Sequence, residues 1–274
     1  MECINKIWQD NISDLAADYT YFSRPRGRDV REKIGIQYKY DLSNSVITLA
    51  ERNMNYGFMF AEAAWILSGR NDLDYITKYM KSYSNYSDDG LTLNGAYGPK
   101  IVDQLSWCKE QIVKDKDTRQ SFLNIWRERP AKSKDIPCTT SIQFLVRDNV
   151  LHLVVNMRSQ DVLLGFCYDV FVFSMIARAM QLMLLETKSK DVDLGICTVN
   201  VGSFHLYDSD YDTYYKMKGA VNGYVPVAYQ QLYLTSGKFD ALEIAANIPY
   251  IYPPSTFKQL IEMLNDLAEK YKKK

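Results

Sequence analysis

Residues 137–169 decide the fold of this chain and read PCTTSIQFLVRDNVLHLVVNMRSQDVLLGFCYD. Two segments within this stretch, 141–146 and 150–157, alternate apolar and polar residues and are rich in β-branched side chains. A short polar break containing Asp148 and Asn149 separates them. Alternating segments around such a break predict a β-hairpin.

The predicted hairpin places a thiol beside a cation. Counting outward from the turn, Cys138 falls opposite Arg158 or Ser159. A guanidinium next to a thiol favours the thiolate, which is the form that attacks an electrophile. The alternative is a structural cysteine near a surface arginine, and the pattern alone leaves both interpretations open.

The same stretch resembles the thymidylate synthase superfamily. That family carries a Pro-Cys nucleophile, a hairpin, the motif Arg-Ser-x-Asp-Val-x-x-Gly, and a residue four positions later that reads the pyrimidine. The matching positions in this chain are Cys138, Arg158, Ser159, Asp161, Gly165 and Asp169. The resemblance extends from about Arg24 to Tyr207 and is strong at the motifs and weak between them.

Two positions differ from true thymidylate synthases. This chain has Thr139 where those enzymes have histidine, and Asp169 where they have asparagine. Both departures resemble the deoxycytidylate hydroxymethylases of T-even phages. Asparagine matches the acceptor and donor of uracil, whereas a carboxyl group accepts from N4 of cytosine and, when protonated, donates to N3. The resemblance therefore implies a cytosine nucleotide as substrate.

The composition limits the classes of protein to which this chain can belong. The chain has 274 residues, 47% of them hydrophobic, so it can bury a core as one large domain, residues 1–274, which the resemblance implies is catalytic. Lysine plus arginine equals aspartate plus glutamate at 33 each, so no global field favours nucleic acid or an anionic membrane. Five cysteines follow no metal or disulfide spacing, which predicts no metal site and fits a reducing cytoplasm.

No targeting segment is expected, because residues 1–10 lack an apolar core. Residues 162–185 are apolar enough to be mistaken for a membrane span, but they contain Asp169, Arg178 and Gln181. A charge at the centre of a bilayer would cost roughly 2.5–3.5 kcal/mol. We therefore predict a buried core helix and a cytoplasmic protein with no membrane partner.

The expected architecture is α/β, or α+β, with one large mixed sheet flanked by helices. Hydrophobic periodicity predicts helices over 1–20, 49–67, 71–83, 101–113, 168–186 and 255–271. Strands are expected over 34–40, 121–126, the two arms of the hairpin, and 191–201. The resemblance adds a homodimer formed through the sheet, with active sites shared between the subunits.

Further site residues follow from the resemblance. Glu62 matches a glutamate that orders water at the base of the site, although on periodicity alone it can sit at the edge of an apolar stripe and reach water. Tyr97 matches a tyrosine in the network that removes the C5 proton. The sugar 3′-hydroxyl is assigned to His205 and Tyr207, and the folate to Asp161 and Gly165.

The phosphate is assigned to arginines and a serine, namely Arg26, Arg119, Arg158 and Ser159. Arg26 lies in a basic loop with Arg24 and Arg28, and the sequence does not decide which of the three holds the phosphate. Arg119 matches an arginine that reaches the nucleotide of the partner subunit, but the second arginine of that pair is Gln120 here. For each of these arginines the alternative is an ordinary solvated side chain.

The function implied is transfer of the methylene of 5,10-methylenetetrahydrofolate to C5 of dCMP or CMP, followed by water addition to give a 5-hydroxymethyl nucleotide. The catalytic residues would be Cys138, Glu62, Tyr97, Arg158 and Asp169. One alternative is plain methylation, by a thymidylate synthase or a cytidylate methylase. Another is a nucleotide-binding homologue without catalysis. For Asp169, the alternative is a structural role as a helix cap.

Overall fold

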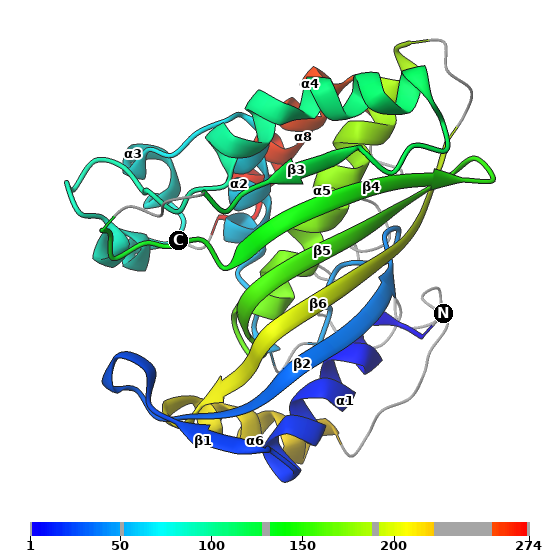
Figure 1. Ribbon diagram of the computed structural model, residues 1–274. Helices are drawn as coiled ribbons and strands as arrows, with labels where there is room; N and C mark the ends of the chain where they lie inside the picture. Colours follow the sequence, from blue (N-terminus) through cyan, green and yellow to red (C-terminus); the bar gives the residue numbers. More distant parts are fainter. Residues whose placement is uncertain (1, 50–51, 128–131, 188–191, 222–253, 273–274) are drawn as a thin grey trace, which may run out of the picture.

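The structure, a computed structural model, describes residues 2–49, 52–127, 132–187, 192–221 and 254–272. These residues contain a six-stranded sheet in the order β1-β2-β6-β5-β4-β3 (Figure 1). The strands are β1 Tyr21–Ser23, β2 Val30–Asp41, β3 Phe122–Asn124, β4 Thr139–Arg147, β5 Val150–Asp161 and β6 Asp193–Tyr207. β5 and β6 are parallel, and the other pairs are antiparallel, so the predicted mixed sheet is confirmed.

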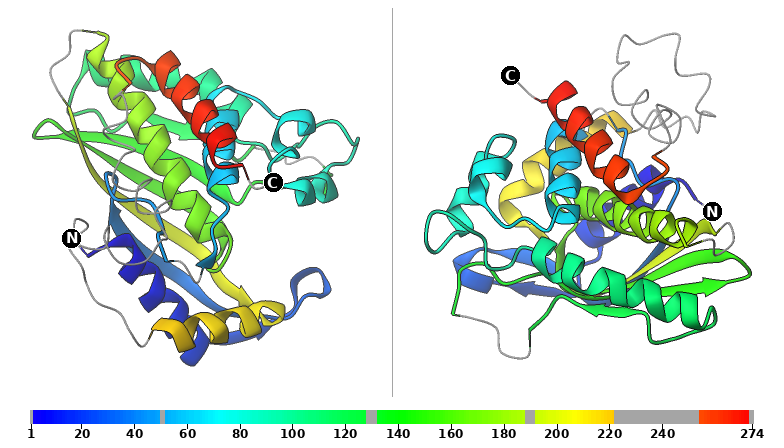
Figure 2. Two further views of the ribbon diagram at one scale, coloured as in Figure 1. Left: turned by 180° about the vertical axis from the view of Figure 1, so that it is seen from behind. Right: turned by 90° about the horizontal axis from the view of Figure 1, so that it is seen from above.

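Helices cover one face of this sheet. They are α1 Ile4–Ala17, α2 Tyr56–Leu67, α3 Leu73–Ile76, α4 Gly98–Lys114, α5 Gly165–Leu185, α6 Tyr211–Val221 and α8 Phe257–Lys270. Short 3-10 turns add η1 Pro25–Gly27, η3 Lys81–Tyr86 and η4 Asp208–Asp210. The left view of Figure 2, seen from behind, shows α5, α8 and α2 lying over this face of the strands. The predicted α/β class, with helices flanking the sheet, is confirmed.

The predicted core helix is α5. Among the described helices it is the one long and apolar enough to cross a membrane by length and composition, and most of it is buried. The hydroxyl of Tyr40 on β2 donates to the carbonyl of Val170 at 2.8 Å. The indole N–H of Trp8 on α1 donates to the carbonyl of Val162, just before α5, at 2.7 Å. The helix is therefore held between the sheet and the other helices.

A row of polar side chains crosses the opposite face of the sheet, which Figure 1 turns toward the viewer. Gln37 Nε2 donates to Asn200 Oδ1 at 2.8 Å, and Asn200 Nδ2 donates to Asn156 Oδ1 at 3.0 Å. Asn156 Nδ2 then donates to Ser141 Oγ at 3.0 Å. No described helix covers this face. It is the face on which the predicted homodimer would form, and that dimer stays a prediction.

The helix predicted over 49–67 begins later than expected. Its first helical residue is Tyr56, and the side chain of Asn55 caps it by accepting from Phe58 N at 3.1 Å. Asn53 has a positive φ of 48°, which a continuous helix does not allow. Residues 50–51 lie outside the described part. The predicted start was wrong because apolar residues continue at helical spacing upstream of Tyr56, where the chain is not α-helical.

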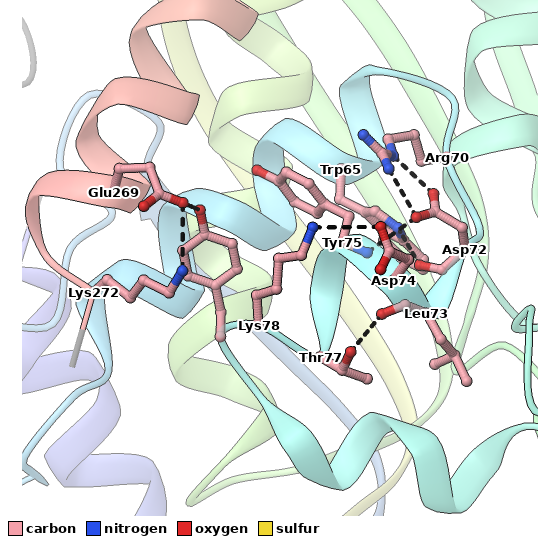
Figure 3. A network of polar contacts seen from close by, with 11 residues as sticks. Trp65, Arg70, Asp72, Leu73, Asp74, Tyr75, Thr77, Lys78, Glu269 and Lys272 are labelled. Carbon is pink, nitrogen blue, oxygen red and sulfur yellow. Dashed lines mark hydrogen bonds and ion pairs between the residues drawn. The ribbon is translucent and has the colours of Figure 1, made fainter. Parts of the chain in front are cut away.

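The helix predicted over 71–83 is mostly wrong. Only α3 is α-helical there, and a 3-10 turn, η3, follows. Tertiary contacts fix this segment instead. Tyr75 Oη donates to Asn265 on α8 at 2.6 Å. Tyr79 Oη donates to Glu269, which Figure 3 shows at the end of α8.

The C-terminal helix α8 is clamped against α2. Its predicted range, 255–271, agrees with the structure. A Cβ on Gly57 at the start of α2 would lie 2.7 Å from the carbonyl oxygen of Tyr271. The glycine therefore allows the backbones to meet, and Lys272 lies over the ring of Tyr79 at 4.9 Å (Figure 3). Residues 273–274 lie outside the described part.

The remaining elements follow the predictions closely. α1, α4 and β3 lie within or over the ranges 1–20, 101–113 and 121–126. β6 is longer than predicted and continues through residue 207, while residue 191 lies outside the described part.

Candidate active site

The hairpin brings Cys138 to Arg158. Asp148 and Asn149 have φ of 49° and 62°, the left-handed conformation of a tight two-residue hairpin turn. Pairing outward from this turn ends with a hydrogen bond from Arg158 N to the carbonyl of Cys138, at 2.8 Å. The structure therefore places the thiol opposite the arginine, as the sequence predicts.

Two donors reach the sulfur of Cys138. Arg158 Nη2 lies 3.7 Å and Ser159 Oγ lies 3.5 Å from Sγ. The guanidinium is fixed by further contacts, from Nε to the carbonyl of Pro137 at 3.0 Å and from Nη2 to that of Ile136 at 2.9 Å. A fixed cation and a hydroxyl at this distance stabilise negative charge on sulfur.

A change of phase in β5 allows two consecutive residues to face the thiol. Burial alternates along the strand up to Met157; then Arg158 and Ser159 both face away from the core, and Gln160 is buried again. The neighbouring strand β6 makes room through Gly202, where a Cβ would lie 2.8 Å from the carbonyl oxygen of Arg158. The irregularity of the sheet therefore builds the donor pair.

A glutamate and two tyrosines are linked to the segment of the thiol. Glu62 on α2 accepts a hydrogen bond from the hydroxyl of Tyr83 in η3. The hydroxyl of Tyr97 accepts from the backbone N–H of Thr139 at 3.1 Å, next to Cys138. Three segments separated in sequence thus meet at one place.

Asp169 lies in the first turns of α5 but does not cap the helix in the structure. Its Oδ2 accepts from Gln160 Nε2 at 2.9 Å, and Gln160 Oε1 accepts from the hydroxyl of Tyr38 at 2.9 Å. Gly165 lies one turn earlier, where an added Cβ would be 3.5 Å from Asp169 Oδ2. The carboxyl group is therefore held on one oxygen.

Both carboxyl groups of the site hold protons tightly. Burial raises the pKa of Asp169 from 3.8 to about 7, although the hydrogen bond from Gln160 lowers it. Burial raises the pKa of Glu62 from 4.5 to about 8, the bond from Tyr83 opposes the rise, and the charge of Asp169 adds to it. Burial, with the charges of Cys138 and Asp169, also raises the pKa of Tyr97 well above its usual value. The charge of Asp169 therefore raises the pKa of both Glu62 and Tyr97.

Asp161 is engaged at the end of β5. Its Oδ1 accepts from the backbone N–H groups of Leu163 at 2.8 Å and Leu164 at 3.1 Å. It pairs with His205 in the β5–β6 register. Burial raises the pKa of Asp161, which its hydrogen bonds and His205 oppose.

The sugar candidates on β6 lie near the basic loop that contains Arg24, Arg26 and Arg28. The rings of His205 and Tyr207 on β6 make an edge contact at 5.1 Å, and the guanidinium of Arg28 lies 3.6 Å from the centre of the Tyr207 ring. Arg24 is paired with a neighbouring aspartate at 3.2 Å. Arg26 is exposed, with a positive φ of 53°, and forms no hydrogen bond or ion pair with another described residue.

Arg119 is not brought to the thiol of its own chain. It is exposed, and its carbonyl accepts from Gln143 Nε2 at 2.8 Å. Gln143 is four residues beyond Thr139 along β4, which is roughly 13 Å in an extended strand. Arg119 is therefore remote from the thiol of its own chain, and its role in the site of a partner subunit stays a prediction.

Sequence reasoning assigned no role to Tyr83, Gln160 or Tyr38. Tyr83 is 21 residues from Glu62, and Tyr38 is 122 residues from Gln160, so no local pattern links them. The sequence offered no signal for Gln160, because simple alternation along the strand places it on the face away from the core. Within the described residues, no cluster of histidine, cysteine, aspartate and glutamate is suited to a metal ion.

Comparison with known proteins places this geometry in a family. The sequence matches the thymidylate synthase family over residues 6–236, so the chain belongs to that family. A deoxyuridylate hydroxymethyltransferase of Bacillus phage SP01 is 32% identical over 209 residues, covering 68% of this chain and 53% of the relative. One from Pseudomonas phage M6 is 31% identical over 175 residues, covering 60% and 48%.

A thymidylate synthase of Vesicomyosocius okutanii subsp. Calyptogena okutanii (strain HA) is 23% identical over 189 residues, covering 65% of this chain and 69% of the relative. The chain spans about half the length of the phage relatives it matches. The predicted membership of the superfamily, near its hydroxymethyltransferases, is confirmed.

The two buried acids predict how stability depends on pH. Because folding raises the pKa of Asp169 and Glu62, the folded state binds these protons more tightly than the unfolded state. Their stabilising contribution is full below about pH 4 and is lost as pH rises through about 7 and 8. Glu62→Gln removes one of them, so we expect its free energy of unfolding to fall less than that of the wild type between pH 5 and 8.5.

Urea denaturation at several pH values measures this. Glu110→Gln, at an exposed glutamate on α4, is the control and should follow the wild-type slope. Equal slopes for Glu62→Gln and the wild type would contradict the assignment of a buried, protonated Glu62.

Proposed function

We propose that this chain is a folate-dependent pyrimidine nucleotide 5-hydroxymethyltransferase that acts on dCMP or CMP. The observation that carries the proposal is a carboxyl group, Asp169, in the cluster of Cys138, Glu62 and Tyr97, with a pKa of about 7. Family membership supports the scaffold, and the names of the phage relatives support hydroxymethyl transfer. Water addition, rather than hydride transfer, would complete the reaction.

The nucleophile is Cys138. Its thiolate, stabilised by Arg158 and Ser159, adds to C6 of the pyrimidine, and the electron pair of the C5–C6 bond makes C5 nucleophilic. 5,10-Methylenetetrahydrofolate supplies the one-carbon unit that joins C5. C5 then loses its proton as the C–N bond to tetrahydrofolate breaks, and an exocyclic methylene is left. Water adds to that carbon, and departure of the thiolate restores the C5–C6 double bond. Bond formation and loss at C6 therefore balance.

Proton transfer and water are the task of Glu62 and Tyr97. Glu62 is held by Tyr83, and its pKa of about 8 lets it exchange a proton near neutral pH. Tyr97 is held beside the thiol by the N–H of Thr139. The Oγ1 of Thr139 is buried and has no hydrogen-bond partner among the described residues, so it is free to bind water where thymidylate synthases have histidine.

The rest of the nucleotide is assigned to the rim of the site. Arg158 and Ser159 are positioned to hold phosphate, with Arg26 from the N-terminal loop and Arg119 from a partner subunit. Arginine binds phosphate through two donors at once, which orients it. His205 and Tyr207 bind the sugar 3′-hydroxyl, and Asp161 and Gly165 face the folate, for which Asp161 Oδ2 is left as an acceptor.

Asp169 favours cytosine. Cytosine offers a donor at N4 and an acceptor at N3, so it needs one oxygen that accepts and one that donates. A pKa of about 7 makes the protonated form abundant near neutral pH. An ionised aspartate leaves N3 of cytosine without a donor, and uracil is matched only when the proton lies on the oxygen that faces O4.

A second candidate substrate is dUMP. The phage relatives are named deoxyuridylate hydroxymethyltransferases, and this observation favours a uracil nucleotide. The two candidates share the nucleophile and the one-carbon transfer and differ only in the partner of Asp169. Side-by-side assays of dCMP, CMP and dUMP distinguish them.

The reaction predicts two products that can be measured together. With C5-tritiated dCMP and 5,10-methylenetetrahydrofolate, the wild type should release tritium and yield a nucleotide heavier by CH2O, without the absorbance of dihydrofolate. Cys138→Ala is the control and should release none. Dihydrofolate in equal amount with a product heavier by CH2 would show a methylase. Binding without tritium release would show a non-catalytic protein.

Replacing Asp169 should change the preferred base. In Asp169→Asn the amide supplies the donor that O4 of uracil needs, so the ratio of kcat/KM for dCMP to dUMP should fall by roughly one to two decades. The product should remain hydroxymethylated, because water is placed by other residues. Asp103→Asn, at an exposed aspartate on α4, is the control and should leave the ratio unchanged. An unchanged ratio in Asp169→Asn would refute base reading by this residue.

The proposed shared site predicts complementation between inactive chains. Arg119→Ala should weaken nucleotide binding, and Cys138→Ala should abolish turnover. A mixed dimer contains one site with both Cys138 and Arg119 intact, so mixing the variants should restore part of the activity. If the mixture stays inactive while subunits demonstrably exchange, Arg119 does not act across a dimer.

A further inference from the structure

Gln160 lies between the base-reading acid and the sheet. Its side chain is 2% exposed, and Tyr38 on β2 is 6% exposed. The Tyr38 hydroxyl donates to Gln160 Oε1 at 2.9 Å, and Gln160 Nε2 donates to Asp169 Oδ2 at 2.9 Å. This buried chain of three side chains joins β2, β5 and α5. Nothing in the proposed chemistry uses Gln160 or Tyr38 directly.

The direction of this chain decides which oxygen of Asp169 carries a proton. With Nε2 of Gln160 toward Oδ2, that oxygen is an acceptor, so a proton on the acid belongs on Oδ1. If the amide were reversed, Gln160 Oε1 would face Oδ2, and the two acceptors would repel unless Oδ2 were protonated. The tyrosine hydroxyl favours the first orientation by donating to Oε1.

We propose that Gln160, oriented by Tyr38, is a positioning residue that keeps the proton of Asp169 on Oδ1 and so fixes the acceptor and donor pair that reads an amino-pyrimidine. The inference rests on the proposed function, because it concerns the base that Asp169 reads. Oδ2 is left as the acceptor and Oδ1 as the donor, which is the pair that cytosine needs when Oδ2 faces its N4 and Oδ1 faces its N3. Without Gln160 the proton is free to occupy either oxygen.

The surroundings of Asp169 make this donor important. The titratable groups that influence it from the packed elements are all acids: Glu62, Asp161, Cys167, Tyr38, Tyr83 and Tyr97. Each raises the pKa of Asp169 when ionised or leaves it unchanged when neutral. The Gln160 amide is the group that lowers it. Loss of that amide should therefore raise the pKa of Asp169 further.

Gln160→Met tests the proposal, because methionine keeps the length of the side chain and lacks the donor. Binding of dCMP and of dUMP, without folate, is measured by calorimetry from pH 5 to 9. We expect dCMP affinity at pH 6 to fall by about two- to tenfold, the worth of one neutral hydrogen bond. The pH at which dCMP binding is lost should move upward, because Asp169 keeps its proton to higher pH. A purely structural role would weaken both nucleotides alike and leave that pH in place.

Two further variants keep the test decisive. Tyr38→Phe removes one oxygen and should shift both readouts in the same direction by a smaller amount, even if Gln160→Met folds poorly. In Asp169→Asn, which has no proton to place, adding Gln160→Met should leave the pH dependence unchanged. A wild type that prefers dCMP, with unchanged selectivity and pH dependence in Gln160→Met and Tyr38→Phe, refutes the inference alone. A wild type that binds dUMP in preference to dCMP at every pH refutes the proposed function and this inference with it.

Discussion

The hydrogen bond from Arg158 N to the carbonyl of Cys138 is the constraint on which the site depends. It fixes the register at the open end of the hairpin, and a slip of one residue would turn every side chain of β5 to the other face. The guanidinium of the same arginine then binds two carbonyls just before the cysteine. One residue therefore holds the backbone of the nucleophile, the segment that leads to it, and the charge beside its sulfur.

This arrangement requires an irregular sheet. In a regular strand Arg158 and Ser159 would point to opposite faces, and only one could reach the thiol. The change of phase in β5 places both on the same side, and Gly202 on β6 leaves space for the displaced carbonyl. The same change returns Gln160 to the core, where it meets Tyr38 and Asp169. The change of phase in β5 therefore does two things. It turns Arg158 and Ser159 toward the thiol, and it brings Gln160 to Asp169.

What the sequence predicted well was local. The turn at Asp148 and Asn149, the placement of Cys138 opposite Arg158, and the buried helix α5 follow from short-range patterns. The start of α2 was misjudged because apolar spacing continued upstream of its Asn55 cap. The chain from Tyr38 to Asp169 was not predictable, because it joins residues brought together only by the order of the strands and the packing of α5. The roles of the site residues remain proposals in either case.

Burying acids in the site lowers the stability of the fold at high pH, and the same burial makes the proposed chemistry possible. An aspartate in water is ionised at neutral pH and offers only acceptors, so it does not match the N3 and N4 edge of cytosine. Burying Asp169 beside Glu62 disfavours charge on both, which lowers stability at high pH and supplies a carboxylic acid near neutral pH. An asparagine would avoid that cost and offer a donor at all pH values, and its amide can present the order suited to uracil only if it turns together with that of Gln160. On the proposed function, the destabilising burial of an acid is what permits a cytosine base to be read, and Gln160 makes that acid present its two oxygens in one order.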